Sequence, residues 1–197
     1  MSAAPDGAPR EQPRADRVGA PGEGFQALGG ESVYEGRLIE VRIERFRHSD
    51  GAEVTREIVR HKGAVGIVAH DAESLWLVRQ PREAVNEPAL LEIPAGRLDK
   101  EGEEPLAAAK RELAEEIGLR ARSWEPILSY YSSAGFTDER VHLFLATDLH
   151  ESSAESGEEE RIEIVRWPLE RLEQAIEGCL DAKTLIGLLW LARRLNA

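Results

Sequence analysis

Hydrophobic residues along the middle of the chain form short runs separated by polar turns, which predicts a sheet. Residues 64–69 are almost continuously apolar, as expected for a strand covered on both faces, and a second strand at 75–80 follows a polar turn. Shorter apolar runs predict four further strands, at 90–93, 126–131, 142–148 and 162–167.

Three segments instead carry the spacing of helices. In residues 105–117 the apolar positions recur at the period of one buried helix face, at Leu106, Ala109, Leu113 and Ile117. Pro105 suits the first turn of this helix, and Gly118 suits the left-handed residue that ends it. Two more helices are predicted at 169–176 and 181–195, so the chain is an α/β protein with a mixed β-sheet between helices.

The N-terminal part of the chain differs from the rest. Residues 1–24 contain four prolines and four glycines and no apolar core, which predicts a disordered tail rather than a signal peptide. Residues 33–47 and 54–60 predict two strands joined by a turn at 48–51. We therefore divide the chain into a tail at 1–24, a hairpin region at 25–60 and a main domain at 61–197.

Composition narrows the functional classes. A chain of 197 residues with 42% hydrophobic and 31% charged residues is typical of one soluble domain. Its net charge of −12 argues against nucleic acid as a partner, since phosphate backbones are bound by clustered lysine and arginine. No run is long enough for a membrane span. The single Cys179 excludes an internal disulfide, which predicts a reducing compartment and therefore the cytoplasm.

Three carboxylates are the strongest sign of chemistry. Glu112, Glu115 and Glu116 have the i, i+3, i+4 spacing that places side chains on one helix face. Such helices are ordinarily solvated and stabilised by pairs such as Arg111 with Glu115. Three carboxylates this close together repel one another, and bound divalent cations would offset the repulsion. Mg²⁺ suits such a site because it prefers a few carboxylates plus water and substrate phosphate.

The stretch from Gly96 to Leu119 resembles the Nudix box of the Nudix hydrolases. From Glu103 onward every fixed position of that pattern is met, through Arg111, Glu112 and the residues that follow. Six residues rather than five separate Gly96 from Glu103, so the loop is one residue longer than the family pattern. The resemblance implies an α/β/α sandwich that hydrolyses a diphosphate bond.

Segments outside the box resemble the ADP-ribose pyrophosphatases, namely residues 77–82, 91–96, 131–140 and 181–184. This resemblance implies hydrolysis of ADP-ribose to AMP and ribose 5-phosphate by a homodimer whose N-terminal hairpin crosses between subunits. Ala134 stands where those enzymes commonly have a proline. Two alternatives therefore stay open: a pyrophosphatase for GDP-mannose, NADH or FAD, and, less favoured because the box carboxylates are retained, a non-catalytic module that senses ADP-ribose.

The same resemblance assigns roles to individual residues of the box. Two or three Mg²⁺ ions, with Mn²⁺ as a substitute, would be held by Glu112, Glu116 and the backbone carbonyl of Ala95, with Glu115 as a ligand or beside the ligands. The spacing of Glu103 and Arg111 predicts an ion pair that holds the loop against the helix rather than a chemical role.

Outside the box, the general base is expected from an acidic loop before the strand at 162–167. Glu160 and Glu158 lie two residues apart and would point the same way in an extended segment; the register favours Glu160, although glutamates in such a run are usually only solvated. The resemblance further implies that the substrate is held by Arg56, from the same or a partner subunit, by Arg82 and Arg79, and by Glu139 at the ribose or a water.

Overall fold

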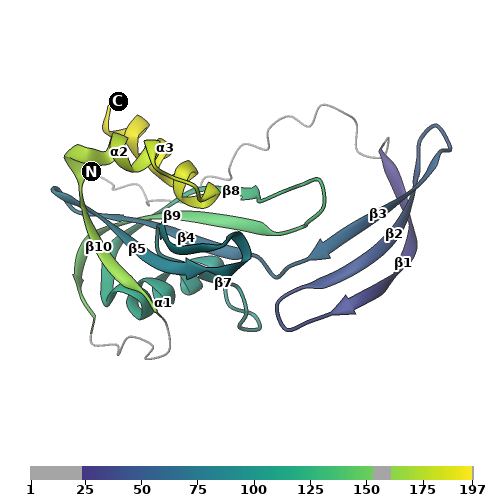
Figure 1. The fold of residues 1–197 in the computed structure, drawn as a ribbon, viewed down its shortest axis with the longest axis horizontal. Helices are drawn as coiled ribbons and strands as arrows, with labels where there is room; N and C mark the ends of the chain where they lie inside the picture. Colours follow the sequence, from purple (N-terminus) through teal and green to yellow (C-terminus); the bar gives the residue numbers. More distant parts are fainter. Residues whose placement is uncertain (1–23, 153–160, 197) are drawn as a thin grey trace, which may run out of the picture.

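The computed structural model describes residues 24–152 and 161–196, which form two sheets and three helices (Figure 1). The first sheet consists of β1 (Phe25–Glu35), β2 (Glu40–His48) and β3 (Glu53–Arg60). The second contains β4 (Ala64–His70), β5 (Ser74–Arg82), β6 (Glu87–Glu92), β7 (Ala95–Arg97), β8 (Leu119–Tyr131), β9 (Arg140–Glu151) and β10 (Glu163–Pro168). The helices are α1 (Pro105–Ile117), α2 (Leu172–Glu177) and α3 (Ala182–Leu195), and single 3₁₀ turns span Glu83–Val85 and Leu169–Arg171.

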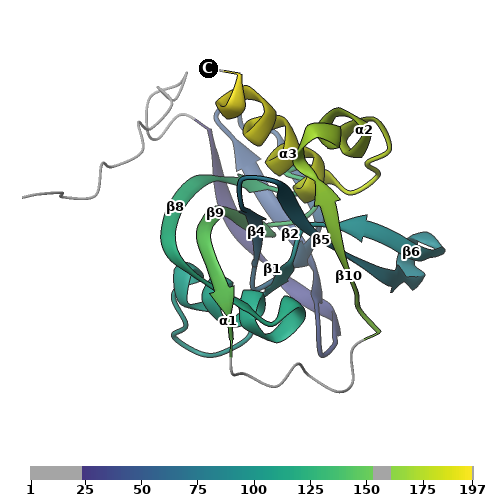
Figure 2. The same ribbon diagram turned by 90° about the vertical axis from the view of Figure 1, so that its left-hand side faces the viewer.

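The larger sheet has seven strands and is mixed, as predicted. Its main path runs β10-β5-β4-β9-β8, with β6 beside β5 and β7 beside β4. The β4–β9 pair is parallel, whereas β4 pairs antiparallel with both β5 and β7. Helix α1 lies on one side of this sheet and α2 and α3 lie on the other (Figure 2), which is the expected α/β/α sandwich.

Strand β4 supplies both layers of the core, because successive side chains of a strand point to opposite faces. Val65, Ile67 and Ala69 are fully buried against α1, next to Leu113. Val68 faces the other way and packs with Leu188 and Leu191 of α3, among other buried residues. The sequence predicted this strand from its continuous apolar run, and burial on both faces explains that run.

The N-terminal region is a three-stranded antiparallel sheet in the order β1-β2-β3. The prediction of a single strand over residues 33–47 is wrong, because the chain turns at 36–39, where the Gly36 amide donates to the Ile39 carbonyl at 2.9 Å. This sheet projects away from the seven-stranded sheet (Figure 1). Its last strand is tied to the main body by a hydrogen bond from Val59 N to Phe136 O of 2.8 Å and by an ion pair between Arg60 and Asp138 of 2.9 Å.

The predicted disordered tail falls, apart from Gly24, outside the described residues. Among those that are described, no helix has both the length and the apolar character needed to cross a membrane. The predicted division into a hairpin region and a main domain stays a prediction.

Candidate active site

Helix α1 presents the three carboxylates to one cavity of the main body. Its limits agree with the prediction: Pro105 is in the first turn, and Gly118 ends it with a left-handed φ of 67°. Leu113 and Ile117 bury the opposite face in the core. One side of the helix is thereby packed against the core, and the other side presents its acidic groups to the cavity.

Strand β7 brings the backbone of Ala95 and Gly96 directly against these acids. The amide of Ala95 donates a 2.9 Å hydrogen bond to Oε2 of Glu116, whose residue is only 7% exposed. A Cβ atom built on Gly96 would lie 1.9 Å from Cδ of Glu112. The absence of a side chain at Gly96 therefore lets Glu112 occupy its present position against β7.

Arg111 connects the loop before the helix to two of the carboxylates. It makes two bonds to Glu103, of 3.0 and 2.8 Å, and its Nη1 contacts Glu112 at 2.6 Å and Glu115 at 2.9 Å. The predicted Glu103–Arg111 ion pair is confirmed. The bonds to Glu103, together with its other carboxylate partners, raise the pKa of the Arg111 guanidinium above its ordinary value, so the group stays cationic.

One cavity of about 640 Å³ collects most of the predicted site residues. It is lined by the three α1 carboxylates and Arg111 on one side, and Arg82 and Glu139 also face it, together with Ala95 and Gly96 of β7. Segments that lie far apart in the sequence thus meet at one cavity.

The donors at this cavity suit a hard divalent cation. Glu112, Glu115 and Glu116 all line the cavity, Glu112 lies against Gly96, and oxygen is the ligand that Mg²⁺ prefers. Within the described ranges 24–152 and 161–196, no three His, Cys, Asp or Glu side chains already converge on a single metal position. Two of the glutamates are drawn to Arg111, so binding a cation would require these side chains to rotate.

A second group of charges lies at the cavity, and the sequence analysis identified only Arg82 among its members. Glu92 of β6 is fully buried and makes two bonds to Arg82, from Nε to Oε1 at 2.5 Å and from Nη2 to Oε2 at 2.8 Å. Lys183 of α3 also donates to Glu92, and it contacts Asp181 at 3.0 Å. The one available signal was an acid within the apolar run 90–93, a position where an unpaired charge would be costly.

Glu139 and Tyr130 complete the rim. Oε1 of Glu139 lies 3.5 Å from Nδ1 of His61, which also accepts a 3.0 Å hydrogen bond from the Gly63 amide. Burial raises the pKa of the Tyr130 hydroxyl, with a further contribution from Asp181, so this group is a neutral hydrogen-bond donor at physiological pH.

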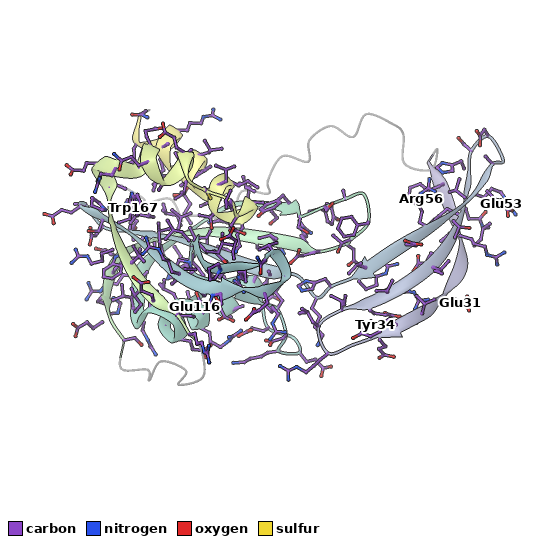
Figure 3. The ribbon with its side chains drawn as sticks, in the orientation of Figure 1. Glu31, Tyr34, Glu53, Arg56, Glu116 and Trp167 are labelled. Carbon is purple, nitrogen blue, oxygen red and sulfur yellow. The ribbon has the colours of Figure 1, made fainter. Side chains whose placement is uncertain are left out.

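Two further predicted residues, Arg79 and Arg56, do not line this cavity. Arg79 lies on β5 and pairs with Glu163 of β10 at 3.3 Å. Arg56 lies on the three-stranded sheet, far from Glu116 (Figure 3), and lines a separate cavity of about 290 Å³ together with Ala134. Glu158 and Glu160 fall outside the described residues.

Comparison with known proteins decides the family. The model of the NUDIX domain matches residues 60–186, which include the cavity's carboxylates and most of the seven-stranded sheet. The chain belongs to the Nudix family. The match spans more than half of the chain and contains the whole motif from Gly96 to Leu119.

Several described proteins are similar to this chain over most of its length. An ADP-ribose pyrophosphatase of Bacillus subtilis is 37% identical over 84% of this chain and 91% of its own length. A methanol dehydrogenase activator of Bacillus methanolicus is 36% identical over 82% of this chain and 89% of its own. A solved structure described as an ADP compounds hydrolase superposes with a TM-score of 0.77 at 26% identity, covering 88% of this chain and 95% of that one.

Proposed function

We propose that this Nudix protein hydrolyses the diphosphate bond of ADP-ribose to AMP and ribose 5-phosphate. The observation that carries the proposal is the cavity in which the carboxylates of α1 meet the Ala95–Gly96 strand and the guanidinium of Arg82. Similarity to an ADP-ribose pyrophosphatase over most of both chains supports this choice of substrate.

Divalent metal would be held by Glu112 and Glu116 and by the carbonyl of Ala95, with Glu115 beside them. We propose two or three Mg²⁺ ions, with Mn²⁺ as a substitute. Bound there, Mg²⁺ would neutralise charge on the diphosphate and lower the pKa of a coordinated water. The residues fit this role because their donors are oxygens that line one cavity.

The protein's own groups then position the reaction. Water attacks one phosphorus, the bond to the bridging oxygen breaks, and that oxygen leaves with the other phosphate. Arg82 would bind the anionic diphosphate, and Glu139 would hydrogen-bond a ribose or a water; both line the cavity. The proton from water would go to Glu160, with Glu158 as the alternative base. Arg111 holds the loop to the helix through Glu103.

The test is product analysis with purified protein. ADP-ribose with MgCl₂ or MnCl₂ should give AMP and ribose 5-phosphate, and H₂¹⁸O should label one of the two phosphates. Glu116→Gln should lower kcat/KM at least about a hundredfold, a loss of roughly 2.7 kcal/mol of barrier lowering, whereas Glu101→Gln, at an exposed loop position, should not. Intact ADP-ribose alongside cleavage of another Nudix substrate would overturn the assignment.

The alternatives are resolved by the same assay. Ala134, in the turn where a proline was expected, keeps GDP-mannose, NADH and FAD as competing substrates. One protein similar to this chain is described as a methanol dehydrogenase activator, so similar proteins have been described with different functions. A substrate panel ranked by kcat/KM decides between the pyrophosphatases, and tight binding of ADP-ribose without AMP release would identify a sensing module.

We also propose that the protein is a homodimer in which the three-stranded sheet contacts the partner. This sheet exposes large apolar side chains, including Phe25 at 68% and Tyr34 at 57%, and such surface is usual at interfaces. In that arrangement Arg56 would reach the partner's cavity. Light scattering after size exclusion should give twice the monomer mass, and a monomer would contradict this proposal. The cytoplasmic location stays a prediction.

A further inference from the structure

The carboxylate of Glu92 is a fully buried charge that contacts two residues lining the active-site cavity, Arg82 and Lys183. It is 0% exposed, it lies at the end of β6, and it receives both a two-bond contact from Arg82 and a contact from Lys183. A buried carboxylate is tolerated only when it is paired and hydrogen-bonded. Here a single carboxylate holds two cations from two different elements, β5 and α3.

Both cations line the cavity rather than the core. The Arg82 side chain is 41% exposed and that of Lys183 is 16% exposed, and both belong to the cavity that contains Glu112 and Glu116. Arg82 uses Nε and Nη2 for Glu92, so its Nη1 donors are available to a ligand. The ammonium of Lys183 has three hydrogens and contacts two carboxylates, which leaves one donor.

Asp181, the second carboxylate that contacts Lys183, is held in place by the start of α3. Its Oδ2 accepts from the Thr184 amide at 2.9 Å and from the Thr184 hydroxyl at 2.6 Å, which caps the first turn of α3. The Thr184 hydroxyl in turn accepts from the Ile93 amide at 2.9 Å. These bonds hold the first turn of α3 and Lys183 at a defined position beside β6.

The glutamates of α1 and the two cations Arg82 and Lys183 thus line the same cavity. A diphosphate bound in this cavity would meet metal at the glutamates and fixed hydrogen-bond donors at Arg82 and Lys183, an arrangement that stabilises charge spread over phosphate oxygens.

We propose that Lys183 is a second cationic contact for the diphosphate of the substrate, and that Glu92 is the positioning residue that holds Lys183 and Arg82 toward it. This inference rests on the proposed diphosphate hydrolysis and adds a binding residue to it. Neither Lys183 nor Glu92 belongs to the motif from Gly96 to Leu119.

The primary test removes the ammonium. Lys183→Met is compared with Lys183→Arg, which keeps the charge, and with Lys110→Met, the same change at an exposed position of α1. Two quantities are measured: kcat and KM for ADP-ribose with Mg²⁺, and Kd for an ADP-ribose analogue with a methylene bridge, which cannot be hydrolysed. Lys183→Met should raise KM and Kd together by about tenfold to a hundredfold, as for loss of a charged hydrogen bond. Lys183→Arg should restore most of the affinity.

The second test addresses positioning. Glu92→Gln should also raise KM and Kd, and the thermal midpoint is recorded because a buried charge is altered. If Glu92→Gln does not fold, the comparison of Lys183→Met with Lys183→Arg decides alone. Both of these variants keep the buried Glu92 carboxylate and its bonds to Arg82. Variants that lower the thermal midpoint but leave both KM and Kd at wild-type values would overturn the inference, because a purely structural network would behave in that way.

Failure of the proposed function gives a different result. If the wild type releases no AMP yet binds the methylene analogue, hydrolysis is wrong and the Kd of Lys183→Met still decides on the contact. If the wild type neither hydrolyses ADP-ribose nor binds the analogue, both statements are overturned. Equal losses in Lys183→Met and Lys110→Met would likewise overturn the inference, since they would reflect net charge alone.

Discussion

Replacing Gly96 by alanine tests the central geometry of the site with a single methyl group. The added Cβ would lie 1.9 Å from Cδ of Glu112, 2.1 Å from its Oε1 and 2.4 Å from its Cγ. Non-bonded carbon atoms approach to about 3.5 Å, so the Glu112 side chain must retreat by about 1.6 Å. The obstacle is the flexible end of a side chain, and the backbone of β7 can therefore stay in place.

The expected cost falls on activity more than on folding. Forcing a side chain off its preferred rotamer costs about 0.5–1.5 kcal/mol, which for a chain of this size lowers the thermal midpoint by roughly 1–6 °C. A displacement of about 1 Å at a reacting centre can cost a hundredfold in rate, or about 2.7 kcal/mol. Gly96→Ala should therefore remain folded while losing about two orders of magnitude in kcat/KM.

The assay is AMP release from ADP-ribose over a range of Mg²⁺ concentrations, with thermal unfolding measured in parallel. Because Glu112 is a proposed metal ligand, the Mg²⁺ concentration for half-maximal rate should rise in Gly96→Ala. Gly178→Ala is the matched control, since a Cβ there would meet its nearest neighbour at an ordinary 3.5 Å. A folded Gly96→Ala enzyme with activity within threefold of wild type and an unchanged Mg²⁺ dependence would refute the reasoning.

Three further predictions concern single contacts. The hydrogen bond from Arg111 holds the pKa of Glu103 below its ordinary value, so its stabilisation is present above the unfolded value of about 4.3 and is lost as the pH falls through the folded pKa. The thermal midpoints of wild type and Glu103→Gln should therefore converge as the pH is lowered, and a constant difference would contradict this. Thr184→Val leaves the Ile93 amide without its acceptor and should lower the free energy of unfolding in urea by about 1–3 kcal/mol, whereas a change below 0.5 kcal/mol would show that the bond is dispensable. Arg79→Ala should change stability by less than about 1 kcal/mol, because the ion pair it removes is exposed, and a tenfold rise in KM would instead place Arg79 at the substrate.

Helix α1 could be predicted to the residue because its signals are local. Pro105, the apolar stripe and Gly118 lie within one short segment, and each acts on the backbone beside it. The strand β4 was equally readable from its own run of apolar residues. In contrast, the turn after Gly36 was missed, because the strands on either side mix charged and apolar residues without a break in pattern.

The pairing of Glu92 with Lys183 could not be predicted, because 91 residues separate them and only the packing of α3 on the sheet brings them together. A motif of consecutive residues can specify the carboxylates that hold metal, since one helix turn sets their spacing. The cations at the same cavity come from β5 and α3 and need no fixed spacing in the sequence. This difference explains why the reaction is easier to infer from this chain than the substrate. Metal ligands form a local sequence pattern, whereas substrate selection depends on residues that only the tertiary fold brings together. Variants of Arg82 and Lys183 would measure that selection directly.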